Sequence, residues 1–107
     1  MSFIDVLPES HLPPGQQRTV SLQGQHILLC HSASGIFAIE DKCPHVGMPL
    51  CGGVLDGDII RCPSHNATFD LRDGKPTKAR RLGSVRCYPV QVRDGHIAVD
   101  PEGAVQD

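Results

Sequence analysis

The chain has no tryptophan, and its only aromatic side chains are three phenylalanines and one tyrosine among 107 residues. No apolar run approaches the ~20 residues that a membrane-spanning helix needs. A basic excess is also missing, because the formal net charge is −2, and this excludes the strong positive charge of a general nucleic-acid-binding protein. These absences predict one small domain, residues 1–107, with no membrane and no nucleic acid among its partners.

The residues at the N-terminus, Met1–Asp5, have neither the basic segment nor the apolar core of a secretory signal. We therefore expect a cytoplasmic protein. Five cysteines are an odd number, so complete disulfide pairing within the chain is impossible. In a reducing compartment such cysteines more often bind metal or stay free than form disulfides.

A long helix is missing from the pattern as well, because 11 glycines and 9 prolines interrupt every apolar spacing of helical period. Alternation of apolar and polar residues instead predicts strands at residues 3–7, 18–22, 25–31, 35–40, 90–93 and 96–99. Asp94-Gly95 separates the last two and is a strong hairpin signal, because a type I′ turn needs positive φ at both central positions. The predicted fold class is all-β, an antiparallel β-sandwich.

Residues 43–76 depart from this alternation and are rich in cysteine, histidine, proline and glycine. We expect them to form a loop-built subdomain inserted between basal strands from about residues 1–42 and 77–107. Two motifs stand out in it, Cys43-Pro44-His45 and Cys62-Pro63-Ser64-His65, with 16 residues between them. One thiolate and one imidazole in each motif suit zinc or iron–sulfur chemistry and argue against magnesium or calcium.

With these motifs the sequence resembles the Rieske [2Fe–2S] proteins. The resemblance includes Gly47-x-Pro49-Leu50, Cys62-Pro63-x-His65-x-x-x-Phe69-Asp70 and the closing run Arg93–Val99. It covers essentially the whole chain and is closest to the small Rieske ferredoxins of multicomponent oxygenases. It implies a Rieske-like sandwich with one [2Fe–2S] cluster, in which Cys43 and Cys62 hold the inner iron and His45 and His65 hold the outer iron.

The resemblance also implies a function and partners. The protein would be a soluble electron carrier, not an enzyme, and would be monomeric. It would move single electrons from an NAD(P)H-dependent ferredoxin reductase to the terminal oxygenase of an aromatic-ring hydroxylating dioxygenase, in aromatic hydrocarbon catabolism. Two other electron-transfer roles stay open, donor to a diiron monooxygenase and small component of an assimilatory nitrite reductase. A zinc-stabilised interaction module is the alternative from another class, since zinc takes the same four ligands tetrahedrally.

A low reduction potential is expected from the same comparison. Replacing two thiolates by imidazoles leaves the oxidised centre formally neutral, and Rieske potentials span about −150 to +300 mV. High-potential members carry a loop disulfide, and the resemblance puts Met48 and Ser64 at those positions. It puts Ala67 and Phe69 where such members have hydroxyl groups near the sulfurs. Fewer hydrogen bonds to sulfur stabilise the reduced cluster less, so we predict the low end of the range.

The remaining cysteines and histidines are expected to be ordinary. Cys51 lies where the family usually has a small polar residue and is predicted to be a non-ligand. Cys30 and Cys87 are predicted core residues, and Asp56-Gly57-Asp58 is predicted to be a turn. The other histidines have no second ligand at metal spacing and are predicted to be surface or hydrogen-bonded residues: His11, His26, His31 and His96.

Basic residues concentrate near the end of the chain. Residues 72–93 hold seven Lys or Arg against one acid, Asp73. This stretch is either a solvated face or a docking surface for an acidic partner, since complementary charge mainly raises the encounter rate.

Two departures from the family pattern lie in or near this basic stretch. Asn66 follows His65 where glycine is common, and Thr77–Arg81 replaces a Gly-Pro-Ala segment, so the third loop over the cluster is not predicted.

Overall fold

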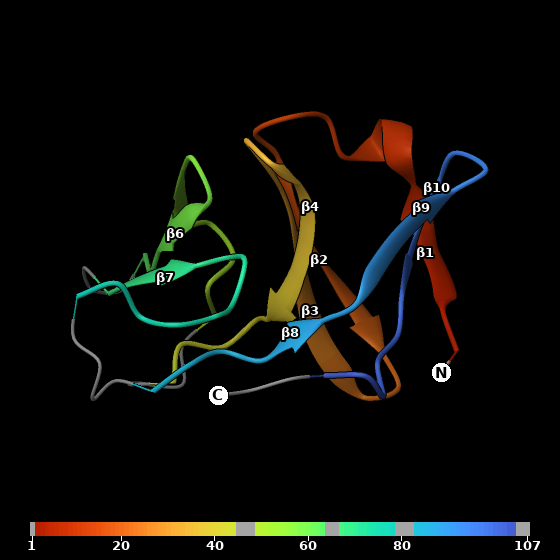
Figure 1. Ribbon diagram of the computed structural model, residues 1–107. Helices are drawn as coiled ribbons and strands as arrows, with labels where there is room; N and C mark the ends of the chain where they lie inside the picture. The colour runs from red at the N-terminus through yellow and green to blue at the C-terminus, as the bar shows by residue number, and fades with distance from the viewer. Residues whose placement is uncertain (1, 45–48, 64–66, 79–82, 105–107) are drawn as a thin grey trace.

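The computed structural model describes residues 2–44, 49–63, 67–78 and 83–104. Within these ranges the chain forms short strands and one 3-10 turn of helix, and the strands pair antiparallel (Figure 1). In chain order they are β1 (Ile4–Pro8), η1 (Glu9–His11), β2 (Gln17–Leu22), β3 (Gln25–Ser32), β4 (Gly35–Glu40), β5 (Val54–Asp56), β6 (Ile59–Arg61), β7 (Thr68–Asp70), β8 (Cys87–Tyr88), β9 (Val90–Arg93) and β10 (His96–Val99).

Two of the three sheets form a sandwich, which we call the base. One sheet has the strand order β1-β10-β9 and the other β2-β3-β4-β8. Their facing side chains share one apolar cluster, so the predicted antiparallel sandwich is confirmed. The buried members of this cluster are Leu7, Leu12, Ile27, Leu29, Ala38, Tyr88, Ile97 and Val99.

The third sheet, β5-β6-β7, packs on the opposite face of β3 and β4 (Figure 1). We call it the small sheet. A second apolar cluster joins Leu28 and Ile39 of the base to Ile60 and Phe69 of the small sheet. The run Ile27–Cys30 is completely buried because both faces of β3 are covered, one by each cluster, which explains why it reads as a continuous apolar segment.

The small sheet is an insertion between two strands that are neighbours in the base. β4 and β8 pair through Ala38 with Tyr88 and Ile39 with Cys87, and β5, β6 and β7 all lie between them in the chain. The sequence predicts loops in this region, whereas the structure also has strands there. Each is only three residues long, too short for alternation to reveal it.

The strands expected at both ends of the chain are present with bounds within one residue of the predicted ones. The β9–β10 turn has φ of 52° at Asp94 and 75° at Gly95, as a type I′ turn requires. Gln23 and Gly24 give the β2–β3 turn the same geometry, with φ of 52° and 76°. In the described ranges no helix is long and apolar enough to span a membrane.

Hydrogen bonds at the β5–β6 turn attach the small sheet to the base. Asp58 accepts hydrogen bonds from the Ser32 hydroxyl at 2.7 Å and from the backbone N–H of Ser34 at 3.0 Å. The Ser34 hydroxyl donates to Oδ2, the other carboxylate oxygen of Asp58. These bonds, first those from the side chains of Ser34 and Ser32, hold the pKa of Asp58 below its usual value. The predicted Asp56-Gly57-Asp58 turn is therefore confirmed, and it joins two parts of the fold.

Candidate metal centre

The two cysteines of the motifs lie between the base and the small sheet. β4 ends at Glu40, and Cys43 follows three residues later; β6 ends at Arg61, directly before Cys62. Cys43 is 0% exposed and Cys62 is 2% exposed. Both belong to the apolar cluster that also contains Phe69. The fold thus brings two thiols, 19 positions apart in sequence, into one dry environment.

The other two predicted ligands, His45 and His65, lie outside the described residues, as do Met48, Ser64 and Asn66. Among the residues that the structure does describe, no group of three or more His, Cys, Asp or Glu side chains could hold a metal ion. Within the described ranges the centre therefore consists of the two buried thiols.

The backbone around Cys62 is closed by one hydrogen bond. The N–H of Cys62 donates to the carbonyl of Ala67 at 2.8 Å, so the segment between these residues begins and ends at the same place, next to β7. Phe69 in β7 is fully buried in the cluster with Cys62. Neither Ala67 nor Phe69 has a hydroxyl group, so neither side chain can donate a hydrogen bond to sulfur.

Near Cys43, the carboxylate of Asp41 collects three hydrogen bonds. Its Oδ1 accepts from the backbone N–H groups of Leu50 and Cys51, each at 2.8 Å. Its Oδ2 accepts from the hydroxyl of Thr19 in β2 at 2.9 Å. The sequence analysis did not identify Asp41, and its only sequence signal is its place two residues before Cys43 at the end of a predicted strand.

Gln17 of β2 binds the turn that follows Leu50 and Cys51 in the chain. Its Nε2 donates to the carbonyl of Gly53 at 2.7 Å, and its Oε1 accepts from the N–H of Gly52 at 2.9 Å. One amide group therefore satisfies a donor and an acceptor of the same turn. No sequence motif marks Gln17, so the sequence analysis missed this residue too.

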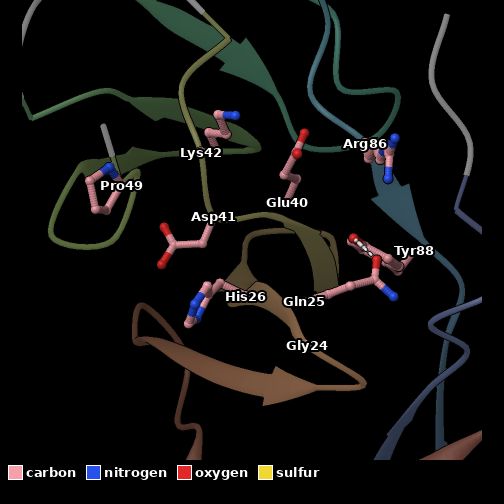
Figure 2. A pocket seen from close by; sticks show the side chains of 9 residues that line it. All are labelled: Gly24, Gln25, His26, Glu40, Asp41, Lys42, Pro49, Arg86 and Tyr88. Carbon is pink, nitrogen blue, oxygen red and sulfur yellow. Dashed lines mark hydrogen bonds between the residues drawn. The ribbon is translucent and has the colours of Figure 1, made fainter. Parts of the chain in front are cut away.

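A hollow of about 500 Å³ lies beside residues 40–42, which lead into Cys43 (Figure 2). Tyr88 lies on one side and donates a hydrogen bond from its hydroxyl to Oε1 of Gln25 at 2.7 Å. Burial is the main cause that raises the pKa of Tyr88. Neither Cys43 nor Cys62 lines the hollow. Its lining is Gly24, Gln25, His26, Glu40, Asp41, Lys42, Pro49, Arg86 and Tyr88.

The remaining cysteines differ in burial. Cys30 is 0% exposed, and burial, followed by the charges of Asp41 and Cys51, raises its pKa to about 12. Cys30 is therefore the core residue that was predicted. Cys87 packs against the same cluster but is only partly buried, so the prediction of a core residue holds in part. Cys51 is exposed.

The remaining histidines agree with the prediction of surface or hydrogen-bonded residues. His11, His26 and His96 are exposed. His31 is partly buried, with its Nδ1 2.8 Å from the carbonyl of Leu12.

Two of the basic residues near the end of the chain have acidic partners. Arg72 binds both carboxylate oxygens of Asp70, at 3.0 and 2.7 Å, and this pair lowers the pKa of Asp70. Arg93 lies 3.5 Å from Asp5. Residues 79–82, which include most of the segment Thr77–Arg81 that departs from the family pattern, lie outside the described residues.

The family model for the Rieske [2Fe-2S] domain matches residues 2–89. This chain belongs to the Rieske [2Fe-2S] domain family. Among curated relatives, the 3-phenylpropionate/cinnamic acid dioxygenase ferredoxin subunit of Photorhabdus laumondii is 35% identical over 92% of this chain and 94% of its own length. The biphenyl dioxygenase ferredoxin subunit of a Pseudomonas species is 30% identical over 94% and 93%.

Among solved structures, the complex of reduced oxygenase and oxidized ferredoxin in carbazole 1,9a-dioxygenase contains a Rieske relative with a TM-score of 0.87. Its sequence is 28% identical, and the match covers 97% of both chains. These relatives confirm the predicted family, the ferredoxin character and the role as an electron-transfer component rather than an enzyme.

The cofactor of a Rieske domain is one [2Fe–2S] cluster, in which two thiolates bind one iron and two imidazoles bind the other. The described residues fit this group. Cys43 and Cys62 are two soft donors, both buried and in the same apolar cluster. The burial excludes water from the sulfurs, and two cysteines are the number that a Rieske centre needs.

Proposed function

We propose that Cys43 and Cys62 bind the inner iron and that His45 and His65 bind the outer iron of the Rieske cluster. The protein then acts as a one-electron carrier from an NAD(P)H-dependent ferredoxin reductase to the terminal oxygenase of an aromatic-ring hydroxylating dioxygenase. The observation that carries this proposal is the joint burial of Cys43 and Cys62 in one apolar cluster, in a chain whose full-length relatives are dioxygenase ferredoxin subunits.

The bound cluster would supply the redox centre, and the protein's own residues would set its surroundings. The apolar side chains around the two thiols keep water away, which limits the reorganisation of solvent when the charge of the centre changes. The backbone bond between Cys62 and Ala67 fixes Cys62 next to the start of β7. Ala67 and Phe69 supply no hydroxyl donor, which supports a potential at the low end of the Rieske range.

The partners are inferred from the relatives. In the solved carbazole 1,9a-dioxygenase complex, a ferredoxin of the same fold is bound to an oxygenase. We infer that a terminal oxygenase and a reductase are the partners of this protein. We also infer that it acts in the cytoplasm and that it is a monomer.

The domain division follows the topology. We propose one Rieske domain over residues 1–107, with a cluster-binding subdomain at about residues 43–76 and basal strands before and after it. The small sheet and both cysteines fall within the proposed subdomain, and β1–β4 and β8–β10 fall outside it.

The ligand assignment is tested by single substitutions in the purified protein. Cys43→Ser and Cys62→Ser should abolish the red-brown absorption and the rhombic EPR signal after reduction. Cys51→Ser is the matched control, because this cysteine is exposed, and it should keep both signals. His65→Cys should keep a cluster at a lower potential, since a thiolate adds negative charge. A colourless wild-type protein with stoichiometric zinc would contradict the assignment.

The carrier role is tested by reconstituted electron transfer. Candidate reductases should be combined pairwise with an aromatic-ring dioxygenase, a diiron monooxygenase and a nitrite reductase. We expect turnover with the dioxygenase only when this protein is present. Turnover with the monooxygenase or with the nitrite reductase, but not with the dioxygenase, would show that the proposed partner is wrong.

A further inference from the structure

Asp41 connects the segment that leads into Cys43 with the segment that follows the first motif. Its Oδ1 accepts hydrogen bonds from the N–H groups of both Leu50 and Cys51. Its own N–H donates to the carbonyl of His26 in β3 at 3.0 Å. One residue thus holds the chain before and after the first motif against the base.

The third hydrogen bond fixes the carboxylate itself. Thr19, which donates to Oδ2, lies in β2 opposite Leu28 of β3. Figure 2 shows Asp41 between His26 and Pro49, with its carboxylate directed to the side of Pro49 and away from Arg86. Hydrogen bonds to a carboxylate are roughly twice as strong as those between neutral groups, so three of them hold this negative charge in one place.

The carboxylate of Asp41 lies against the apolar cluster that holds both thiols, because it accepts a hydrogen bond from the N–H of Leu50, a buried member of that cluster. The charge of Asp41 is, after burial, the second cause of the raised pKa of Cys30. Cys30 belongs to the same apolar cluster as Cys43 and Cys62. Because Leu50, which donates a hydrogen bond to this carboxylate, belongs to the same cluster as Cys43 and Cys62, a redox centre at these two cysteines would lie in the electric field of Asp41.

We propose that Asp41 is a positioning residue that fixes the chain around the first motif, and that its negative charge lowers the reduction potential of the cluster. This inference rests on the proposed function, because it needs the cluster at Cys43 and Cys62. Reduction adds one electron, supplied by the reductase, to the centre. A fixed negative charge nearby opposes that addition, whereas the oxidised centre is formally neutral and is little affected.

Asp41→Asn separates the two effects. The amide oxygen of asparagine still accepts hydrogen bonds from Leu50 and Cys51, but the charge is gone. At a fixed solution potential we expect the ratio of reduced to oxidised protein to rise about tenfold, which for one electron is about 59 mV. Hydrogen–deuterium exchange at the Leu50 and Cys51 amides should stay as slow as in the wild type. Asp41→Ala should raise the ratio too, and should also speed exchange at these two amides.

Asp58→Asn is the matched control. Asp58 also accepts three hydrogen bonds that join the small sheet to the base. Asp58 is bound to Ser34, which lies just before the start of β4, whereas Asp41 and Cys43 lie just after its end. The strand has six residues and is about 20 Å long at ~3.3 Å per residue, so Asp58 and Asp41 lie near opposite ends of it. We therefore expect Asp58→Asn to change the ratio less than twofold.

Equal shifts in the two variants, or no shift in Asp41→Asn, would overturn the proposed role of the charge. Unchanged amide exchange in Asp41→Ala would overturn the positioning role. A wild-type protein without the cluster spectrum would instead refute the proposed function, so the two failures are distinguishable.

Discussion

Gln17 of β2 donates a hydrogen bond to the carbonyl of Gly53 at 2.7 Å, while its own carbonyl accepts one from Gly52 at 2.9 Å. The two bonds need a donor and an acceptor in one side chain, and an amide provides both. One side chain of the base sheet thereby binds both a donor and an acceptor of the turn before β5.

Gln17→Glu should destabilise the fold more than its small change in size suggests. A carboxylate has no hydrogen to donate, so its oxygen would face the carbonyl of Gly53. We expect the free energy of unfolding to fall by about 1–3 kcal/mol, the range for a polar group left without its partner. Gln16→Glu, at the exposed neighbouring position, is the control in a urea titration. Equal losses in both variants would show that charge alone is responsible.

Gly53→Ala should disrupt the same turn by steric overlap. A Cβ at Gly53 would lie 2.2 Å from the carbonyl oxygen of Arg61, which belongs to β6 and cannot move independently of the small sheet. We expect a loss above about 2 kcal/mol in the free energy of unfolding. Gly57→Ala is the comparison, since a Cβ there meets nothing within 4 Å and only the φ of 60° is unfavourable. It should lose about 1 kcal/mol. The reverse order in urea midpoints would contradict the predicted clash.

Thiol labelling should distinguish the cysteines outside the motifs. Cys51 is exposed, whereas Cys30 is completely buried and has a pKa of about 12. The thiolate is the reactive form, so at pH 8 iodoacetamide should label Cys51 and leave Cys30 unmodified in the folded protein. Mass spectrometry of the digested protein gives the extent of labelling at each position. Labelling of Cys30 at a comparable rate would mean that the core opens readily.

The hydrogen bonds to Asp58 should make stability depend on acid. Because its pKa in the folded protein is lowered, the ionised side chain stabilises the fold above the unfolded-state pKa of about 3.9. This contribution is lost as pH falls through the lower folded-state pKa. The difference in urea midpoint between wild type and Asp58→Asn should therefore be largest at neutral pH and should shrink below about pH 4. Asp56→Asn, at an exposed position across Gly57, is the control variant in the same titrations. A difference that grows in acid would contradict the sign.

Ala67→Ser should raise the reduction potential. Ala67 accepts the backbone hydrogen bond of Cys62, so a hydroxyl at this position enters the surroundings of a proposed ligand. A hydrogen bond of about 1–1.5 kcal/mol that favours the reduced state corresponds to about tenfold in the redox equilibrium, or about 59 mV. Ala33→Ser in the exposed β3–β4 turn is the control in protein-film voltammetry. A wild-type midpoint well above zero, or equal shifts in the two variants, would argue against the absence of hydroxyl donors as the cause of a low potential.

Strands with a clear local pattern could be predicted from the sequence. β4 (Gly35–Glu40) was predicted at its observed bounds, and the Asp94-Gly95 turn has the positive φ values that its residues favour. The strands of the small sheet could not be predicted, because three residues hold no measurable period. The tight turn near Gly24 could be predicted from the two strands that flank it, whereas the residue type of Gln23 gives no indication of its positive φ.

The residues of the candidate site also fall into two groups, those that the sequence indicates and those that only the structure shows. The motifs predicted Cys43 and Cys62 as ligands because ligand type and spacing are local in sequence, and the structure places both in one buried cluster. The supporting residues Gln17 and Asp41 were not identified, because their role depends on register between distant strands. Gln17 acts on Gly53, 36 positions away, and no pattern in one sequence reveals such a contact.

The pairing of β1 with β10 has a consequence for biosynthesis. Ile4 lies opposite Val99, and both β1 and β9 depend on β10 as the strand between them. On the ribosome, β1 is made first yet has no partner in its sheet until His96–Val99 has been made. Both motifs are complete long before that point, so the chain has all four proposed ligands before its first strand can pair. A chain released before residue 96 has been made would therefore leave the edges of β1 and β9 without their common partner and exposed to aggregation.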